Sequence, residues 1–277
     1  MADYIKYEIE VTNEGQADIL TAYLSELPFE SFENEENLLC AYIQSTEEEQ
    51  YTDEIASILS DTKWCTSEIK SQNWNAVWES DFTEVEVDNQ VFIRAPFHTP
   101  RPEFKEREIV IQPKMSFGTG HHATTQLMVR MLLDASPKGA RVLDMGSGTG
   151  VLAILAARLG AESVLAVEID DMAEESVREN IEINGVAECV ESVCGDASAI
   201  KGRCFDMILA NINRNILLRD MSDYRTTLVE GGTLTISGFL AEDIESLTNH
   251  AQTLGLVCEK HLSNEGWQAL RFRLIGK

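Results

Sequence analysis

Three glycines stand at alternate positions, Gly146, Gly148 and Gly150, at the end of segment 141–150, which reads RVLDMGSGTG. The segment starts as an apolar strand, and an Ala- and Leu-rich helix follows it. Because glycine has no Cβ, such a turn lets a ligand lie against the main-chain N–H groups at a helix start. A dinucleotide-binding turn would need another glycine where this chain has Val151, so pyrophosphate binding is disfavoured. The motif alone also fits an ordinary tight turn.

Two carboxylates follow the turn at positions where open α/β sheets bind nucleosides. Glu168 ends the strand VLAVEI, 22 residues after Gly146, where a carboxylate can accept hydrogen bonds from both ribose hydroxyls. Asp196, in CGDAS, ends the next strand at the same edge of the sheet, where an adenine amino group could be recognised. Asp196 could instead be a loop residue that starts a helix. The three features together predict a nucleoside site.

Alternating strand and helix patterns would position these residues. From Ile109 onward the strand patterns are IVIQP, RVLDM, VLAVEI, CVESVCG and FDMILAN, with helical patterns through Leu133, Leu159 and Asn184 between them. This alternation predicts parallel strands with helical crossovers, a doubly wound α/β sheet. The closing stretches LVCEKHLS and QALRFRLI could complete it as an antiparallel edge pair. Two short strands are expected around Asp88-Asn89.

The N-terminal part has a different pattern. It predicts the order βαββαβ, the ferredoxin-like α+β arrangement, with strands at 4–11, 29–33, 38–43 and 64–69 and helices at 18–27 and 52–59. Asn13 with Gln16, and Thr46 with Glu49, have the spacing of helix start signals. Residues 71–84 are expected to form a linker, so the domains are 1–70 and 85–277.

Charge is concentrated near the N-terminus. The chain of 277 residues has 22 basic and 47 acidic side chains, a formal net charge of −25, and residues 1–66 alone carry 16 acidic and 2 basic groups. Such a balance argues against broad binding to nucleic acid or to an anionic membrane, because those affinities need clustered Lys and Arg. A basic protein partner remains open, and the acidity could also serve solubility alone.

The six cysteines are scattered without a C-x-x-C pair, which predicts reduced thiols and no metal site. The start MADYIKYEIE lacks the pattern of a signal peptide, and no apolar run approaches the roughly 18 residues that span a bilayer. We therefore expect a cytoplasmic protein that contacts no membrane, and a monomer.

The glycine turn with its two carboxylates resembles class I S-adenosylmethionine-dependent methyltransferases. The segments SFGTGHHATT at 116–125 and FDMILANIN at 205–213, the WNAVW sequence at 74–78 and the acidic N-terminal domain resemble the bacterial ribosomal protein L-eleven (L11) methyltransferase family. The resemblance covers nearly the whole chain. It implies a Rossmann-like methyltransferase domain at 85–277, a substrate-recognition domain at 1–70, and transfer of methyl groups from S-adenosylmethionine to lysine side-chain and N-terminal amines of L11.

Matching the family's motifs residue by residue implies which side chains bind the cofactor. Phe117 and the Gly118–Gly120 loop would fold over its methionyl part. Glu168 stands where Asp is more usual, and Ala123 where many members have Pro, and neither change removes a functional group. The cofactor-binding candidates are Phe117, Thr125, Gly146, Gly148, Glu168, Asp196 and Asn211.

Asn211 is also the catalytic candidate. It follows the apolar strand MILA, and its side-chain carbonyl could accept a hydrogen bond from an attacking amine. It could instead hold only the cofactor or a turn, because the Asn-Pro-Pro-Tyr sequence used on nucleobase amines is absent. A lysine amine must lose a proton before attack. His121, His122 or water could accept that proton, or desolvation in the pocket could favour the neutral amine.

The sequence is also consistent with two rival functions. The chain could be a methyltransferase for another protein, a small molecule or nucleic acid, although the charge of −25 argues against nucleic acid. It could also be a non-catalytic nucleotide-binding adaptor. Glu168, the intact glycine turn and the FGTG loop all argue against the adaptor.

Overall fold

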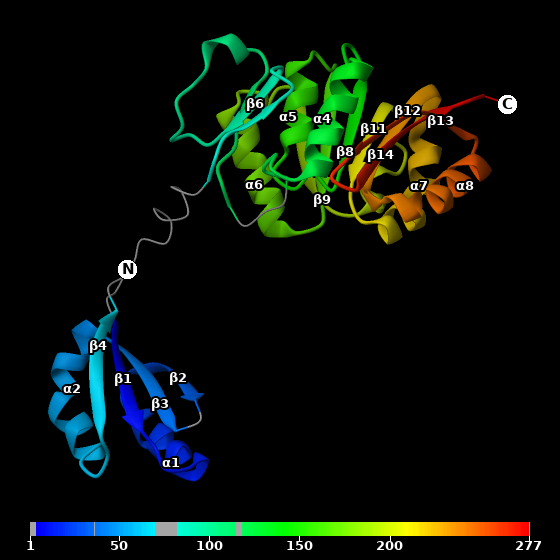
Figure 1. Ribbon diagram of the computed structural model, residues 1–277. Coiled ribbons are helices and arrows are strands. Elements are labelled where there is room, and N and C mark those ends of the chain that lie inside the picture. Colours follow the sequence, from blue (N-terminus) through cyan, green and yellow to red (C-terminus); the bar gives the residue numbers. More distant parts are fainter. Residues whose placement is uncertain (1–3, 36, 70–81, 115–117, 277) are drawn as a thin grey trace. The chain divides into compact units, whose positions relative to one another are not determined.

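The chain folds into two compact units, residues 1–81 and 82–277 (Figure 1). The computed structural model describes residues 4–35, 37–69, 82–114 and 118–276. Within these ranges, none of the helices is both long enough and apolar enough to cross a lipid bilayer. The linker predicted at residues 71–84 lies outside the described ranges except for its last three residues.

The first unit is a four-stranded antiparallel sheet with two helices. Its strands lie in the order β2-β3-β1-β4. The elements follow one another in the order expected from the sequence: β1 (Tyr4–Glu10), α1 (Glu14–Leu24), β2 (Phe29–Glu35), β3 (Leu38–Gln44), α2 (Ser45–Ile58) and β4 (Trp64–Ile69).

One face of this sheet is buried beneath the helices. Tyr7 and Ile9 of β1 lie in the core, whereas Lys6 and Glu8, which alternate with them along the strand, lie on the opposite face. The core also takes Ala17, Leu20 and Leu24 from α1, whose spacing places them on one side of the helix. The sheet is therefore two-sided, with an apolar face inside and a polar face outside.

The two helix starts differ from each other. Asn13 caps α1 by accepting a hydrogen bond from the Gln16 amide (3.0 Å), and the Gln16 side chain accepts one from the Thr12 amide (2.8 Å). The start predicted at Thr46 is wrong, because α2 begins at Ser45 directly after β3, without a side-chain cap. Both helices begin earlier than their apolar periodicity indicates, since their first turns are polar.

The second unit is built on a seven-stranded mixed sheet in the order β10-β9-β8-β11-β12-β14-β13. The first five strands in this order are parallel, and β14 is antiparallel to both of its neighbours. This confirms the predicted doubly wound sheet with an antiparallel edge pair. Its strands are β8 (Arg141–Met145), β9 (Ser163–Glu168), β10 (Val190–Cys194), β11 (Phe205–Asn211), β12 (Leu228–Leu240), β13 (Leu256–Asn264) and β14 (Trp267–Leu274).

Helices cover both faces of this sheet (Figure 1). Successive residues of β8 point to opposite sides, so Val142 packs with α4, α5 and α6, and Leu143 packs with α7 and α8. The helices are α4 (Ala123–Ala135), α5 (Val151–Arg158), α6 (Asp171–Ile183), α7 (Arg214–Thr227) and α8 (Ile244–Thr253), with short 3₁₀ turns η1 (Pro102–Phe104), η2 (Ala197–Ile200) and η3 (Ala241–Asp243).

A small sheet precedes the large one. It consists of β5 (Val85–Val87), β6 (Val91–Arg94) and β7 (Glu108–Val110). Asp88 and Asn89 have φ values of 51° and 53°, which makes the tight turn of the predicted hairpin. The expectation that IVIQP opens the large sheet is wrong, because its first residues belong to β7, which pairs with β6.

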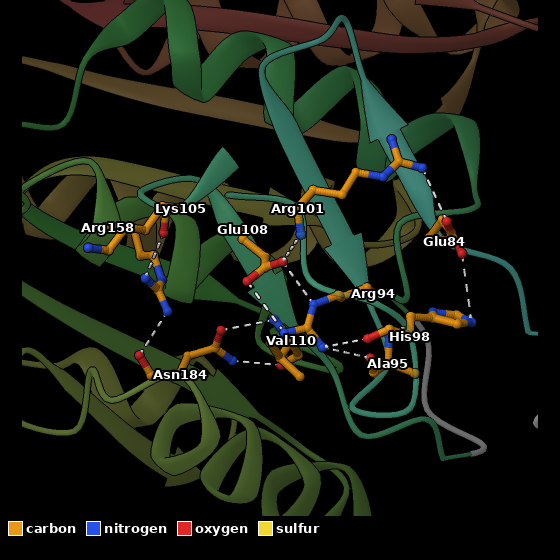
Figure 2. A network of polar contacts seen from close by, with 10 residues as sticks. All are labelled: Glu84, Arg94, Ala95, His98, Arg101, Lys105, Glu108, Val110, Arg158 and Asn184. Atoms are coloured by element: carbon orange, nitrogen blue, oxygen red, sulfur yellow. Dashed lines mark hydrogen bonds and ion pairs between the residues drawn. The ribbon is translucent and has the colours of Figure 1, made fainter. Parts of the chain in front are cut away.

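Polar contacts fix the small sheet in place (Figure 2). Arg94, which is 8% exposed, donates from Nε to Glu108 Oε1 (2.8 Å) and from Nη1 to the Ala95 carbonyl (3.0 Å). On the other side of β7, the Asn184 side chain bonds both the N–H (2.9 Å) and the C=O (2.6 Å) of Val110. An asparagine side chain thus makes the backbone hydrogen bonds that a neighbouring strand would make on this side of β7.

Candidate functional site

The candidate residues meet where the large sheet changes direction. The chain passes from β8 outward to β9 and β10, and then returns to β11 on the other side of β8. Met145 at the end of β8 pairs with Ala210 of β11, so the glycine turn and Asn211 follow neighbouring strands. The carboxyl ends of parallel strands at such a point form the ligand-binding crevice of doubly wound sheets.

The glycine turn has a conformation that favours glycine. Gly146, Gly148 and Gly150 have φ values of 72°, 57° and 82°. A Cβ at Gly146 would lie 2.3 Å from Cγ2 of Ile212, so no larger residue fits there without movement. The Gly146 amide donates to the Val167 carbonyl (2.8 Å), which ties the turn to β9.

A cavity of about 200 Å³, here called the main cavity, opens beside this turn. Five of the seven cofactor-binding candidates line it. Its walls are Met145, Gly146, Gly148, Val167, Glu168, Ile169, Gly195, Asp196, Ala197, Asn211, Ile212, Ile216, Arg219 and Asp220.

Backbone amides hold Glu168 at the wall of the main cavity. Its Oε2 accepts a hydrogen bond from Gly148 N (2.8 Å), and its Oε1 accepts one from Ile169 N (2.9 Å). These bonds orient a half-buried carboxylate and connect it directly to the glycine turn. Charged acceptors of this kind form the stronger hydrogen bonds.

Asp196 serves as a helix cap. Its Oδ1 accepts a hydrogen bond from Ser198 N (2.8 Å) at the start of η2. Hydrogen bonds from the Ser198 side chain and then from its amide lower the pKa of Asp196. The helix-starting role left open by the sequence is therefore confirmed, and the same side chain also lines the main cavity.

A smaller cavity lies on the other side of the glycine turn. Three buried polar atoms here have no hydrogen-bond partner within the described ranges: Thr125 Oγ1, Ser147 Oγ and Asn211 Oδ1. Buried polar groups are nearly always paired, so this cavity is suited to a polar ligand group. Its walls are Gly118, Thr125, Gly146, Ser147, Gly148, Val151, Leu152 and Asn211. The candidate Phe117 lies outside the described residues.

A third cavity of about 340 Å³, here called the side cavity, also reaches Asn211. Ile212, Ile216 and Trp267 give it apolar walls, and His122 and Asn211 add polar groups. Asn211 is the candidate that lines the main, smaller and side cavities alike. A group that enters the side cavity therefore meets a residue that also lines the other two.

The two adjacent histidines have different surroundings. His121 contacts the Thr83 carbonyl through Nε2 (2.9 Å) and Thr119 Oγ1 through Nδ1 (3.0 Å). His122 caps α4, where its Nδ1 accepts from the Thr124 amide, and its ring lies 4.9 Å from that of Trp267. Only His122 of the pair lines the side cavity.

Several residues at the site were not predicted from the sequence. Asp144 is fully buried below the turn, its Oδ2 accepts from Ala153 N (3.1 Å), and burial together with the charge of Glu168 raises its pKa to about 7. Arg219 and Asp220 of α7 form a paired hydrogen bond (2.5 and 2.8 Å) at the far wall of the main cavity. Asp144 stands just before the glycines of the turn, so the sequence could have indicated it, whereas Arg219 and Asp220 belong to no motif.

The described residues contain no cluster of three His, Cys, Asp or Glu side chains able to hold a metal ion. The sheet order, the glycine turn at the point of reversal and the carboxylate at the end of β9 together define a Rossmann-like methyltransferase. Solved structures agree on the fold. A methyltransferase from Pyrococcus furiosus has a TM-score of 0.52 at 19% identity, over 61% of this chain and 90% of that one.

More similar relatives identify the family. The chain matches the ribosomal protein L11 methyltransferase (PrmA) family over residues 7–274. A ribosomal protein L11 methyltransferase from Porphyromonas gingivalis is 45% identical over 97% of both chains, and one from Bacteroides fragilis is 41% identical over 93% of this chain and 94% of the other. The solved ribosomal protein L11 methylase from Lactobacillus delbrueckii has a TM-score of 0.65 at 28% identity, covering 70% of this chain and all of that one. The chain therefore belongs to the ribosomal protein L11 methyltransferase family.

Proposed function

We propose that this protein transfers methyl groups from S-adenosylmethionine to amino groups of ribosomal protein L11, both on lysine side chains and at the N-terminus. The observation that carries the proposal is the position of Asn211, a residue that lines all three cavities and whose buried Oδ1 has no hydrogen-bond partner among the described residues. Membership of the L11 methyltransferase family supports the choice of substrate.

The residues around the glycine turn suit this cofactor. The Glu168 carboxylate can accept hydrogen bonds from ribose hydroxyls, and Asp196 can accept one from an adenine amino group. Thr125 Oγ1, which is buried without a partner in the described structure, suits the polar methionyl end. When bound, S-adenosylmethionine supplies a methyl group on a positively charged sulfur, which is a good leaving group.

Asn211 would orient the amine. Its Oδ1 can accept a hydrogen bond from an amine N–H, which turns the nitrogen lone pair away from the amide and toward the cofactor side of the site. Positioning of this kind is the main task, because attack by a neutral amine needs little further chemical assistance.

The side cavity would receive the amine and favour its neutral form. A lysine amine has an unperturbed pKa near 10.4, and desolvation lowers that pKa. Ile212, Ile216 and Trp267 provide the apolar surroundings. His122 lines the same cavity and is the titratable group placed to accept the proton there.

We further propose that residues 1–70 are a ferredoxin-like domain that docks L11, that 71–84 form the linker, and that 85–277 carry catalysis. The strand order β2-β3-β1-β4 fits that arrangement. A ribosomal protein that binds RNA is basic, so an acidic domain would speed its encounter with the enzyme. We also propose that the protein is a cytoplasmic monomer that contacts neither membranes nor nucleic acid. The net charge of −25 supports the absence of nucleic-acid binding.

Mass spectrometry of purified L11 tests the function. After incubation with the protein and S-adenosylmethionine, L11 should gain about 14 Da for each methyl group, and fragmentation should place the groups on lysine and N-terminal amines. Cofactor binding without any gain in mass would contradict L11 as the substrate and would favour another protein or a small molecule.

A further inference from the structure

Thr149 connects the glycine turn to a segment that lies far from it in the sequence. Its hydroxyl donates a hydrogen bond to the Gly118 carbonyl (2.8 Å), and its own carbonyl accepts one from Asn180 Nδ2 (2.9 Å). Thr149 and Asn180 are both completely buried. One residue inside the turn therefore contacts both the loop before α4 and the last turn of α6.

Asn180 and Asn184 extend this connection to residues 110–112. Asn180 Oδ1 accepts from the Gln112 amide (2.8 Å), and one helical turn later Asn184 makes its two bonds with Val110 (Figure 2). Side chains from the last turn of α6 and from its C-cap residue thus bind the backbone that leaves the small sheet. The segment is tied to α6 at Gln112 and to Thr149 at Gly118, and Thr149 is itself bonded to α6.

The bond from Thr149 to Gly118 lies at the wall of the smaller cavity. Gly118 and Thr125 line this cavity from one segment, and Gly146 and Gly148 line it from the turn. A Cβ at Gly118 would lie 3.1 Å from Thr149 Oγ1, so the two segments are in close contact. The hydroxyl of Thr149 therefore sets the separation of two walls that share one cavity.

We propose that Thr149 is a positioning residue for the cofactor. Its hydroxyl, supported from behind by Asn180, holds the segment at Gly118 against the glycine turn, so that the smaller cavity has its shape before the cofactor enters. Pre-formed cavities gain affinity because less ordering remains to be done on binding. This inference rests on the proposed use of S-adenosylmethionine and adds a residue that does not touch the reacting atoms.

The test uses the full chain and three substitutions. Thr149→Val removes the hydroxyl at nearly constant volume, and Thr149→Ser keeps it. Thr227→Val is the matched control, because Thr227 is also buried and donates to a backbone carbonyl (3.1 Å to Tyr224), but in α7 and away from the cavities. Calorimetry with S-adenosylhomocysteine gives affinities, kinetics give KM and kcat, and circular dichroism gives the melting temperature.

Thr149→Val should weaken S-adenosylhomocysteine binding about 3- to 10-fold and raise the KM for S-adenosylmethionine by a similar factor, which is the size expected for one hydrogen bond. The kcat at saturating cofactor and the KM for L11 should stay at wild-type values. Thr149→Ser and Thr227→Val should both bind as the wild type does. Should Thr149→Val fail to fold, Thr149→Ala removes the same hydroxyl.

Wild-type affinity in Thr149→Val, or an equal loss in Thr149→Ser, would overturn the inference. A lower melting temperature with unchanged affinity would do the same, because it would assign the hydroxyl to stability alone. The comparison of affinities does not depend on L11. A wild-type protein that binds S-adenosylhomocysteine but leaves L11 unmodified would contradict the proposed substrate and leave the test of Thr149 intact.

Discussion

The two units of the chain place their polar side chains in opposite ways. In the first unit, carboxylates lie exposed on the outer face of the sheet, where Tyr42 Oη donates to Glu33 (2.7 Å) and the Gln44 amide donates to Glu30 (2.5 Å). In the second unit, Thr125 Oγ1 and Asn211 Oδ1 are buried and have no partner in the described part of the chain.

These arrangements have different energetic consequences. An exposed, hydrogen-bonded carboxylate is nearly neutral for stability and acts through its field on approaching molecules. A buried polar atom without a partner costs about 1–3 kcal/mol, so a protein retains it where a ligand will pair with it. The first unit is thus suited to encounter with a basic protein and the second to chemistry. Substitutions in the two units should change different steps of the reaction.

The largest effect is expected at Asn211. Asn211→Ala removes the side-chain amide of the residue that lines all three cavities, so kcat for L11 methylation should fall on the order of 100-fold, the loss typical of a misplaced reactant. Asn249→Ala is the control, because Asn249 is exposed on α8 and lines none of the three cavities, so its loss should leave the rate unchanged. Equal rates for Asn211→Ala and the wild type would refute the catalytic role.

A smaller effect is expected for the cofactor carboxylate. Glu168→Gln should weaken binding of S-adenosylhomocysteine by about 1–3 kcal/mol, because the hydrogen bonds to ribose and to the glycine turn lose their charge. Asp170→Ala is the control, since Asp170 caps α6 outside the main cavity by accepting from Ala173 N (2.8 Å). Unchanged affinity by calorimetry would mean that the ribose is held elsewhere.

Burial should also show in the response to pH. The pKa of Asp144 is about 7 in the folded protein, against an ordinary value of 3.8, because burial disfavours its charge. Between these values the folded state binds more protons than the unfolded state, so stability falls as pH rises. From pH 5 to 6, Asp144→Asn should gain about 1.4 kcal/mol relative to the wild type. Denaturant unfolding at both pH values measures this, and parallel pH profiles would exclude a raised pKa.

The smallest effect is expected on the acidic sheet face. Glu30→Gln with Glu33→Gln should slow association with L11 about 2- to 5-fold at low salt and leave it unchanged at high salt, as expected for electrostatic steering. Stopped-flow binding measures the rate. Glu182→Gln with Glu188→Gln removes two exposed carboxylates from the second unit and should have less effect. An equal effect would show that total charge matters and its location does not.

The parts of the fold that could be predicted from the sequence are those fixed by local pattern. The buried strands β8 and β11 are mainly apolar, and the glycines after β8 indicate a turn. The sheet edge that carries Glu168 and Asn211 could therefore be predicted from the sequence. The start of α2 could not be predicted by apolar periodicity, because its first turn is acidic. The place of β7 could not be predicted from local pattern, because its partners, β6 and the side chain of Asn184 74 residues away, are known only from the folded chain.

The same limit applies to the site. Asp144 and Thr149 stand inside the glycine motif, yet their roles depend on burial and on Gly118 and Asn180, which only the folded chain brings near. Asp220 follows no motif, and it reaches the main cavity because α7 packs across the end of β11. Motifs therefore identify the residues that a ligand contacts, and the structure adds those that hold them.

The division of work between the units is tested most directly by comparing the full chain with a fragment of residues 82–277. Methylation of L11, followed by mass spectrometry, and affinity for S-adenosylhomocysteine would be measured side by side. We predict that the fragment binds S-adenosylhomocysteine as tightly as the full chain does, but leaves L11 unmodified at concentrations where the full chain adds about 14 Da per methyl group. A fragment that methylates L11 as fast as the full chain would contradict it.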